Sequence, residues 1–127
     1  MENNSNNPFS NKHDKDRELA LQLIVKQVEK GTGESLSELK EQFTERALFA
    51  IALRHTTTTK KAFCTALEIP VESGCRYKRL LEKDGNLVQS AEKVICPLTK
   101  HLAHLISTNP KEFERLRKSS ADQLNLF

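Results

Sequence analysis

Three breaks divide the second half of the chain, and they constrain its fold more than any other feature of the sequence. The run Thr56 to Thr59 holds four β-branched residues, which are poor helix formers and good helix caps. Ile69-Pro70 predicts a turn and a new helix, because proline has a preset φ and lacks an amide hydrogen. Asp84-Gly85 predicts the end of that helix. The sequence therefore predicts two short helices joined by a tight turn.

The basic charge of the chain is concentrated in this helical pair. The 127 residues are 37% hydrophobic, which suits one domain with one core, and the net charge is +3. Residues 59–83 hold six Lys or Arg against three Asp or Glu, while residues 1–58 hold eight against nine and residues 84–127 six against five. This distribution permits nucleic acid as a partner without requiring it.

The cysteines and the apolar segments indicate the compartment. Cys64, Cys75 and Cys96 are odd in number and contain no C-x-x-C pair, which argues against a disulfide framework and a structural zinc site. The N-terminus has no apolar core of signal-peptide length, and no segment approaches the roughly 20 apolar residues of a membrane span. We expect a cytoplasmic protein with reduced thiols and no membrane partner.

The first half of the chain is expected to be helical after a short arm. Residues 1–13 are rich in Asn and have little to bury, so they predict a disordered arm. Leu19 to Val28 predicts a helix that ends at Gly31 and Gly33. Its apolar face is broader than one neighbouring element covers, so we expect this helix to pair two copies across a two-fold axis.

A second helical region follows. Ser35-Leu-Ser-Glu38 fits a capping box, in which the Ser hydroxyl and the Glu carboxylate each bind a free backbone amide. Apolar residues recur at helical spacing from Leu36 to Leu53 and become nearly continuous in the later turns. This pattern predicts one central core helix.

After Gly85 the apolar periodicity changes from helical to strand-like. We expect short antiparallel strands at Leu87-Val88, at Val94-Ile95-Cys96 and from Leu102 to Ile106. Asn109-Pro110 then predicts a short helix that ends near Lys118.

Two quoted segments carry a resemblance to a known family. Residues 59–88, TKKAFCTALEIPVESGCRYKRLLEKDGNLV, resemble the helix-turn-helix of bacterial winged-helix proteins, and residues 96–113, CPLTKHLAHLISTNPKEF, resemble small winged-helix proteins of Bacteroidetes genomes and mobile elements. The resemblance implies a mainly α winged helix-turn-helix fold with a small antiparallel β wing. The residues predict a disordered arm at 1–13, a domain at 14–118 and a tail at 119–127. The resemblance implies that these residues of the domain face inward: Phe63, Leu67, Ile69, Tyr77 and either Leu80 or Leu81.

The chain departs from the family pattern at two positions. Glu68 stands where the family usually has a turn glycine, which places a non-glycine residue in a left-handed turn at a cost of about 1 kcal/mol. Gly74 stands where the family usually has a buried Val or Ile, and it either lets the two helices approach more closely or loosens their packing.

The resemblance implies a site for double-stranded DNA, in which cations and helix N-termini bind phosphates and side chains in the major groove read base edges. Three residues would clamp phosphate at the start of the first helix: Thr59, Lys60 and Lys61. Five would lie on the outward face of the second: Val71, Glu72, Cys75, Arg76 and Arg79. Arg76 and Arg79 are the candidates for base or phosphate contacts, and Lys93, expected near the wing tip, would reach the adjacent backbone.

Some of these residues have simpler interpretations. Glu72 is also typical of a residue that complements the helix dipole, and Cys75 is also an ordinary small residue. Lys78 and Lys83 are also typical of a solvated surface.

The C-terminal sequence Gln123-Leu-Asn-Leu-Phe127 resembles the short peptide by which bacterial replication and repair proteins bind the DNA sliding clamp. In that motif the glutamine makes polar contacts and the apolar residues fill a pocket, which assigns Gln123, Leu124, Leu126 and Phe127 to partner binding. The alternative is that the apolar residues cover this domain's own surface or a second copy.

Catalytic and metal-binding patterns are weak. Cys96, His101 and His104 have a metal-like composition, but residues three apart on a strand point to opposite faces. The sequence contains no Gly-rich phosphate loop, nucleophile elbow or paired carboxylates. We expect no metal, no cofactor and no enzymatic activity. Two functions remain: a DNA-binding transcriptional regulator or mobile-element accessory factor, and a protein-interaction module that recruits a replication partner through its tail.

Overall fold

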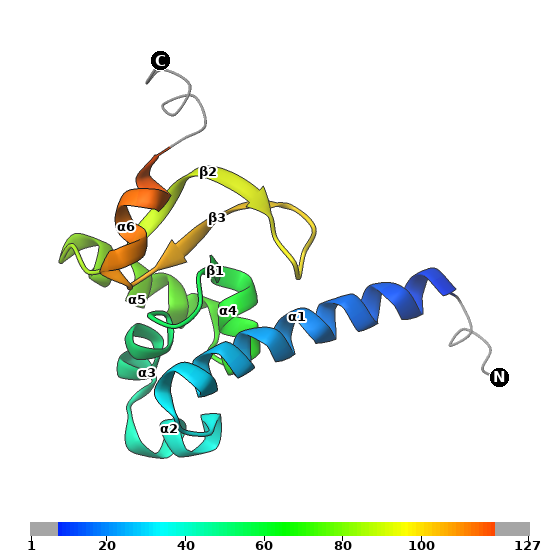
Figure 1. Ribbon diagram of the computed structural model, residues 1–127, viewed down its shortest axis with the longest axis horizontal. Helices are drawn as coiled ribbons and strands as arrows, with labels where there is room; N and C mark the ends of the chain where they lie inside the picture. The colour runs from blue at the N-terminus through cyan, green and yellow to red at the C-terminus, as the bar shows by residue number, and fades with distance from the viewer. Residues whose placement is uncertain (1–7, 119–127) are drawn as a thin grey trace.

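The structure, a computed structural model, describes the backbone of residues 8–118 and the side chains of residues 15–118. This part of the chain is mainly helical with a small antiparallel sheet, as predicted (Figure 1). Its elements are α1 (Pro8–Thr32), α2 (Leu36–Gln42), α3 (Glu45–Ala52), β1 (Thr58–Thr59), α4 (Lys60–Leu67), α5 (Val71–Lys83), β2 (Val88–Ile95), β3 (Leu102–Ser107) and α6 (Pro110–Arg117).

Helix α1 is longer than predicted and extends away from the body of the molecule (Figure 1). It begins at Pro8, within the segment expected to be a disordered arm, because proline suits the first turn of a helix. Among its described side chains, from residue 15 onward, the buried ones lie in the C-terminal half: Ile24 and Val28 are buried, and α4 is the main neighbour. Gly33 follows its end with φ of 78°, as the glycines predicted.

The predicted single helix from Leu36 to Leu53 is wrong, because the chain breaks at Phe43. That residue is extended, with φ −121° and ψ 150°, and the Thr44 hydroxyl accepts a hydrogen bond from the Ala47 amide to cap α3. Apolar residues recur at helical spacing on both sides of the break because each helix buries residues of its own, Leu39 in α2 and Leu48, Phe49 and Ala52 in α3.

The capping box at Ser35 is confirmed. The Ser35 hydroxyl accepts a bond from the Glu38 amide at 3.2 Å, and the Ser35 amide donates to the Glu38 carboxylate at 3.0 Å. The backbone bond from Ser35 holds the pKa of the Glu38 carboxyl below its usual value.

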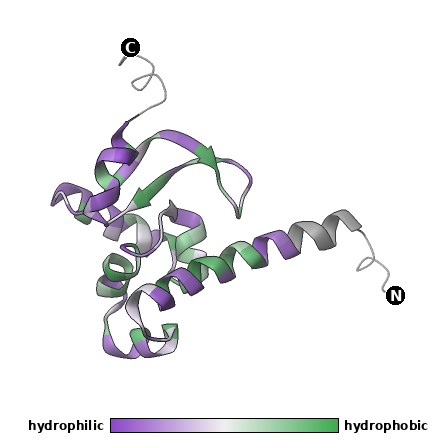
Figure 2. Ribbon diagram, in the orientation of Figure 1, coloured by the Kyte–Doolittle hydropathy of each residue, from purple (hydrophilic) through white to green (hydrophobic). Residues whose placement is uncertain are grey.

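The core lies between α3, α4 and α5, where Figure 2 shows apolar residues gathered. Phe49 is fully buried and meets Phe63 edge-on at a centroid distance of 5.3 Å and Tyr77 at 5.7 Å. Leu81 is partly buried and packs on this core, whereas Leu80 is 41% exposed, so Leu81 is the inward residue of the two.

Glycine at position 74 permits a close approach of α4 and α5. Gly74 is buried, and a Cβ atom added to it would lie 2.4 Å from Cys64 Sγ. The first of the two interpretations of Gly74, closer helix packing, is therefore confirmed.

The prediction that Glu68 adopts a left-handed conformation is also confirmed, with φ of 61° and ψ of 38° at the end of α4. Its carboxylate accepts a bond from Lys40 Nζ at 2.5 Å. Pro70 immediately precedes α5 as its N-cap residue, and Asp84 follows its end.

We expect Glu68→Gly to raise the free energy of unfolding by up to about 1 kcal/mol, because glycine adopts positive φ without a Cβ clash. The lost ion pair contributes less, since the side chains of Lys40 and Glu68 are 36% and 77% exposed. Glu68→Gln is the control, because it removes the charge but keeps the Cβ atom. Urea unfolding measures both variants, and a glycine variant less stable than the glutamine variant would contradict the prediction.

The sheet has the strand order β1-β3-β2, and all neighbours are antiparallel. Strand β1 was not predicted as a strand: Thr58 pairs with Ile106 and Thr59 with Leu105. Its two residues are too few to show an alternating pattern, so sequence periodicity cannot reveal it.

The β2–β3 hairpin differs from the three short strands predicted. Val88–Ile95 is one strand, with an irregular register between Gln89 and Lys93, and the hairpin turn lies at residues 96–101. Lys93 pairs with His104 and lies three residues before the hairpin turn, not in the turn itself. At this irregularity the Ser90 hydroxyl accepts a hydrogen bond from the Leu105 amide at 2.9 Å.

Helix α6 packs against β2 and β3, and the Asn109 side chain caps it by accepting from the Lys111 amide. The predicted bounds of this helix are confirmed to within a residue. No helix within residues 8–118 is long and apolar enough to cross a membrane. The predicted partner-binding residues at 123–127 lie outside the described residues.

Candidate nucleic-acid interface

A groove of about 300 Å³ lies where α4, α5 and the β2–β3 hairpin meet. Four lysines line it, from α4, α5 and β2, and we call them the lysine groove: Lys60, Lys61, Lys78 and Lys93. Gln89, Leu102, Ala103, His104 and Ile106 complete the lining, so none of the described residues that line the groove is acidic. The groove is therefore a concave surface of positive charge.

Two of the lysines lie at the start of α4, where unbonded amides and the helix dipole add to the positive potential. Thr59 fixes this helix start, since its hydroxyl accepts from the Ala62 amide and bonds Cys96 Sγ at 3.0 Å. Thr59 itself is 0% exposed. The predicted contact between Thr59 and phosphate is therefore corrected: this residue positions Lys60 and Lys61 but is not accessible to a ligand.

The other two lysines come from α5 and from the hairpin. Lys78 Nζ donates to Glu82 Oε1 at 2.9 Å, and the two side chains are 19% and 37% exposed. Such a partly exposed pair is weak enough to be exchanged for a phosphate. Lys93 is exposed on β2, and its partner in the register, His104, bonds the Ser90 carbonyl oxygen through Nδ1 at 2.7 Å.

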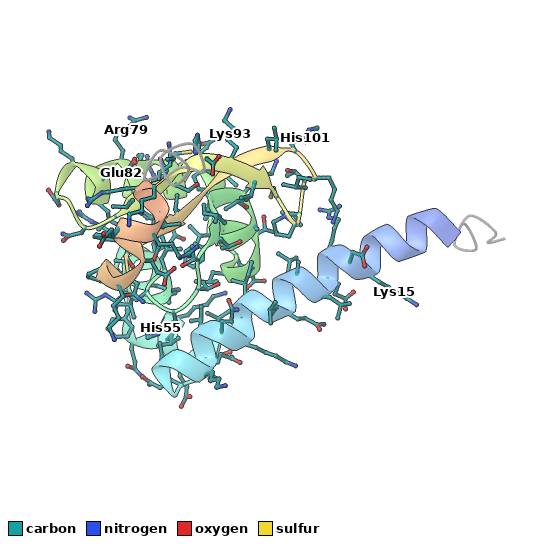
Figure 3. All side chains as sticks on the ribbon, turned by 45° about the horizontal axis from the view of Figure 1, so that its top comes forward. Lys15, His55, Arg79, Glu82, Lys93 and His101 are labelled. Atoms are coloured by element: carbon teal, nitrogen blue, oxygen red, sulfur yellow. The ribbon has the colours of Figure 1, made fainter. Side chains whose placement is uncertain are left out.

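The outward face of α5 carries exposed side chains next to this groove. Arg76, Arg79, Val71 and Glu72 are all exposed, as predicted, and Arg76 Nη2 donates to Ser73 Oγ at 3.4 Å. Arg79 and Lys93 project from the same side of the molecule, away from His55 (Figure 3). The structure thus brings α5 and the hairpin to one cationic face.

Cys75 was predicted to lie on the outward face of α5 that contacts DNA, but it is turned partly inward. It is half-buried, and its Sγ accepts a bond from Lys60 Nζ at 2.9 Å. The thiol therefore lies between α5 and the lysine groove, where it orients the Lys60 side chain.

Sequence reasoning missed Lys78, Gln89 and His104 as groove residues. Helical spacing places Lys78 on a flank of α5, but the spacing does not reveal that the hairpin lies beside that flank. Gln89 and His104 depend on the strand register, which their neighbours in the sequence do not indicate.

Other features of the described residues give weaker evidence for a functional site than the lysine groove does. No group of three or more His, Cys, Asp or Glu within them is placed to hold a metal ion. A larger hollow of about 510 Å³ lies between α3, α5 and α6, and Arg54 is the one charged residue among those that line it.

Comparisons of the chain with protein-family models, with curated proteins and with solved structures find no match. The geometry and charge of the lysine groove are therefore the basis for assigning a function.

Proposed function

We propose that the chain is a non-catalytic DNA-binding protein of the winged helix-turn-helix type, either a transcriptional regulator or an accessory factor of a mobile element. In this proposal α4 and α5 form the helix-turn-helix, and the β2–β3 hairpin is the wing. The observation that supports it best is the lysine groove, in which cations from three elements converge without an acidic neighbour in the lining. The three free thiols suit the reducing cytoplasm in which such a protein would act.

Charge and shape support double-stranded DNA as the ligand. Phosphate contacts set the position of a protein on the duplex, and an exposed helix then reads base edges in the major groove. The lysine groove would take the backbone, while Arg76 and Arg79 of α5 would reach into the major groove beside it. The 13 residues of α5 span about 20 Å, enough to lie along a major groove.

Fluorescence anisotropy of a labelled generic duplex, titrated at several salt concentrations, tests the proposal. We expect micromolar binding that weakens steeply with salt. The double variant Arg76→Ala, Arg79→Ala should lose about tenfold or more in affinity, because charged contacts to phosphates and bases are removed. The control is Arg115→Ala, Arg117→Ala on α6, which makes the same charge change elsewhere. If the protein does not bind the duplex even at low salt, the proposed function is excluded.

We also expect Glu82→Gln to strengthen DNA binding by about two- to fivefold at low salt, because it releases Lys78 and removes a carboxylate near the phosphates. Glu114→Gln is a matched control, since Glu114 also pairs with a lysine four residues away, at 3.4 Å on α6. The same titration measures both variants. Equal gains in the two variants would mean that net charge, not Lys78, sets the affinity.

The second candidate function is a protein-interaction module that recruits the sliding clamp through Gln123, Leu124, Leu126 and Phe127. The peptide-like sequence QLNLF favours it. Removal of residues 123–127 would abolish clamp binding in a pull-down and leave the affinity for duplex unchanged. Loss of duplex binding in the truncated chain would instead link the tail to the DNA site.

A further inference from the structure

The face of α1 that points away from the body carries two exposed leucines. Leu19 is 62% exposed and Leu23 is 56% exposed, whereas Ile24 and Val28 are buried against the body. At about 100° per residue, the two leucines lie on the side of the helix opposite to these buried residues. The N-terminal part of α1 extends away from the body, and apolar bands lie along the helix (Figure 1, Figure 2).

Two opposite charges flank these leucines on the same face. Asp16 lies three residues before Leu19, and Lys26 lies three residues after Leu23, a spacing at which helical side chains are neighbours. Both charged residues are exposed. The α1 stripe, which we define as Asp16, Leu19, Leu23 and Lys26, therefore runs acid, leucine, leucine, base along the helix.

We propose that the α1 stripe binds the same stripe of a second copy of this chain in an antiparallel pair. Reversing the helix direction places Leu19 opposite Leu23 and Asp16 opposite Lys26, so the stripe is complementary to itself about a two-fold axis. A parallel pair would instead place Asp16 opposite Asp16 and Lys26 opposite Lys26, which is unfavourable. The opposite charges at the two ends of the stripe thus favour a second copy as the partner and an antiparallel direction of the two helices.

The pairing is weak and sensitive to salt. Two leucines per copy cover far less than the roughly 800 Å² per partner of a stable interface, so the dimer forms only at high protein concentration or when two copies are held close together. Exposed ion pairs add little and are screened by salt. The same register pairs Lys30, which is exposed, with a second lysine of the sequence at position 12, and salt screens the repulsion between such charges.

Sedimentation equilibrium of the full chain at low salt tests the pairing through two charge reversals. Asp16→Lys and Lys26→Asp each place like charges opposite each other twice in the symmetric dimer. Each should therefore weaken self-association by about tenfold. An equimolar mixture of the two variants restores both opposite-charge pairs, so the mixture should associate as the unchanged chain does. Residues 16 and 26 are about 15 Å apart on one helix, so no contact within a chain mimics this rescue.

Circular dichroism checks that both variants keep the helical content of the unchanged chain, as expected for exposed positions. Leu19→Ser, Leu23→Ser should abolish association. A chain that stays monomeric at hundreds of micromolar, or single reversals that associate as the unchanged chain does, would overturn the proposal. None of these outcomes depends on whether the lysine groove binds DNA.

Discussion

Gly74→Ala is expected to lower the free energy of unfolding by about 1–3 kcal/mol, although alanine is the better helix former. The new Cβ atom would lie 2.4 Å from Cys64 Sγ, which is too close for two non-bonded atoms. Cys64 is fully buried between helices and cannot swing into solvent. Burial also raises the pKa of its thiol to about 11, so the side chain is a neutral, tightly packed group at ordinary pH.

Removing the sulfur should reverse the sign of this effect. In a Cys64→Ala background, the 2.4 Å contact with the sulfur disappears, and the Cβ atom of residue 74 would have Phe49 Cε2 at 3.6 Å and the Cβ atom of residue 64 at 4.0 Å, both ordinary van der Waals distances. There Gly74→Ala should stabilise the protein by up to about 1 kcal/mol, the gain in helix propensity. Urea unfolding of the four chains in this double-mutant cycle measures the coupling. If Gly74→Ala destabilises both backgrounds equally, the contact with Cys64 does not set the distance between α4 and α5.

This close approach also positions the proposed DNA site. Gly74 lies one turn before Lys78 on α5, and Cys64 lies one turn after Lys60 on α4. A larger residue at position 74 pushes the two helices apart and separates two lysines of the groove. Gly74 is thus a residue on which the geometry of the groove depends.

Features set by a few neighbouring residues were predictable from the sequence. The capping box at Ser35, the cap at Thr59 and the cap at Asn109 each involve bonds spanning at most three residues. The left-handed conformation of Glu68 was expected from the resemblance, in which a turn glycine usually stands at this position. In each case the residues that form the structure are adjacent in the chain.

Features set by distant residues were not predictable. Strand β1 exists because Thr58 and Thr59 pair with Ile106 and Leu105. The position of Lys93 on the hairpin is set by the strand register, which is irregular near Ser90. There the Ser90 hydroxyl accepts a hydrogen bond from the Leu105 amide. The lysine groove combines residues that lie far apart in the sequence, and composition alone showed only that the region is basic.

Replacing all four lysines of the groove, as Lys60→Gln, Lys61→Gln, Lys78→Gln and Lys93→Gln, should weaken binding to duplex DNA by about a hundredfold or more at about 0.1 M salt. Each lysine that contacts a phosphate releases counterions from DNA. Losing all four should therefore lower the slope of log affinity against log salt by about 3 to 4. Anisotropy titrations over a range of salt concentrations measure both quantities.

A matched control separates the groove from net charge. Lys30, Lys40, Lys111 and Lys118 are exposed and do not line the groove, so their replacement by glutamine changes the net charge equally. This control should weaken binding only modestly and leave the salt slope nearly unchanged, because the slope counts contacts with phosphates. Equal slopes for the two quadruple variants would mean that DNA binds by diffuse attraction and not in the groove. A reduced slope in the groove variant alone would place the DNA backbone between α4, α5 and the hairpin.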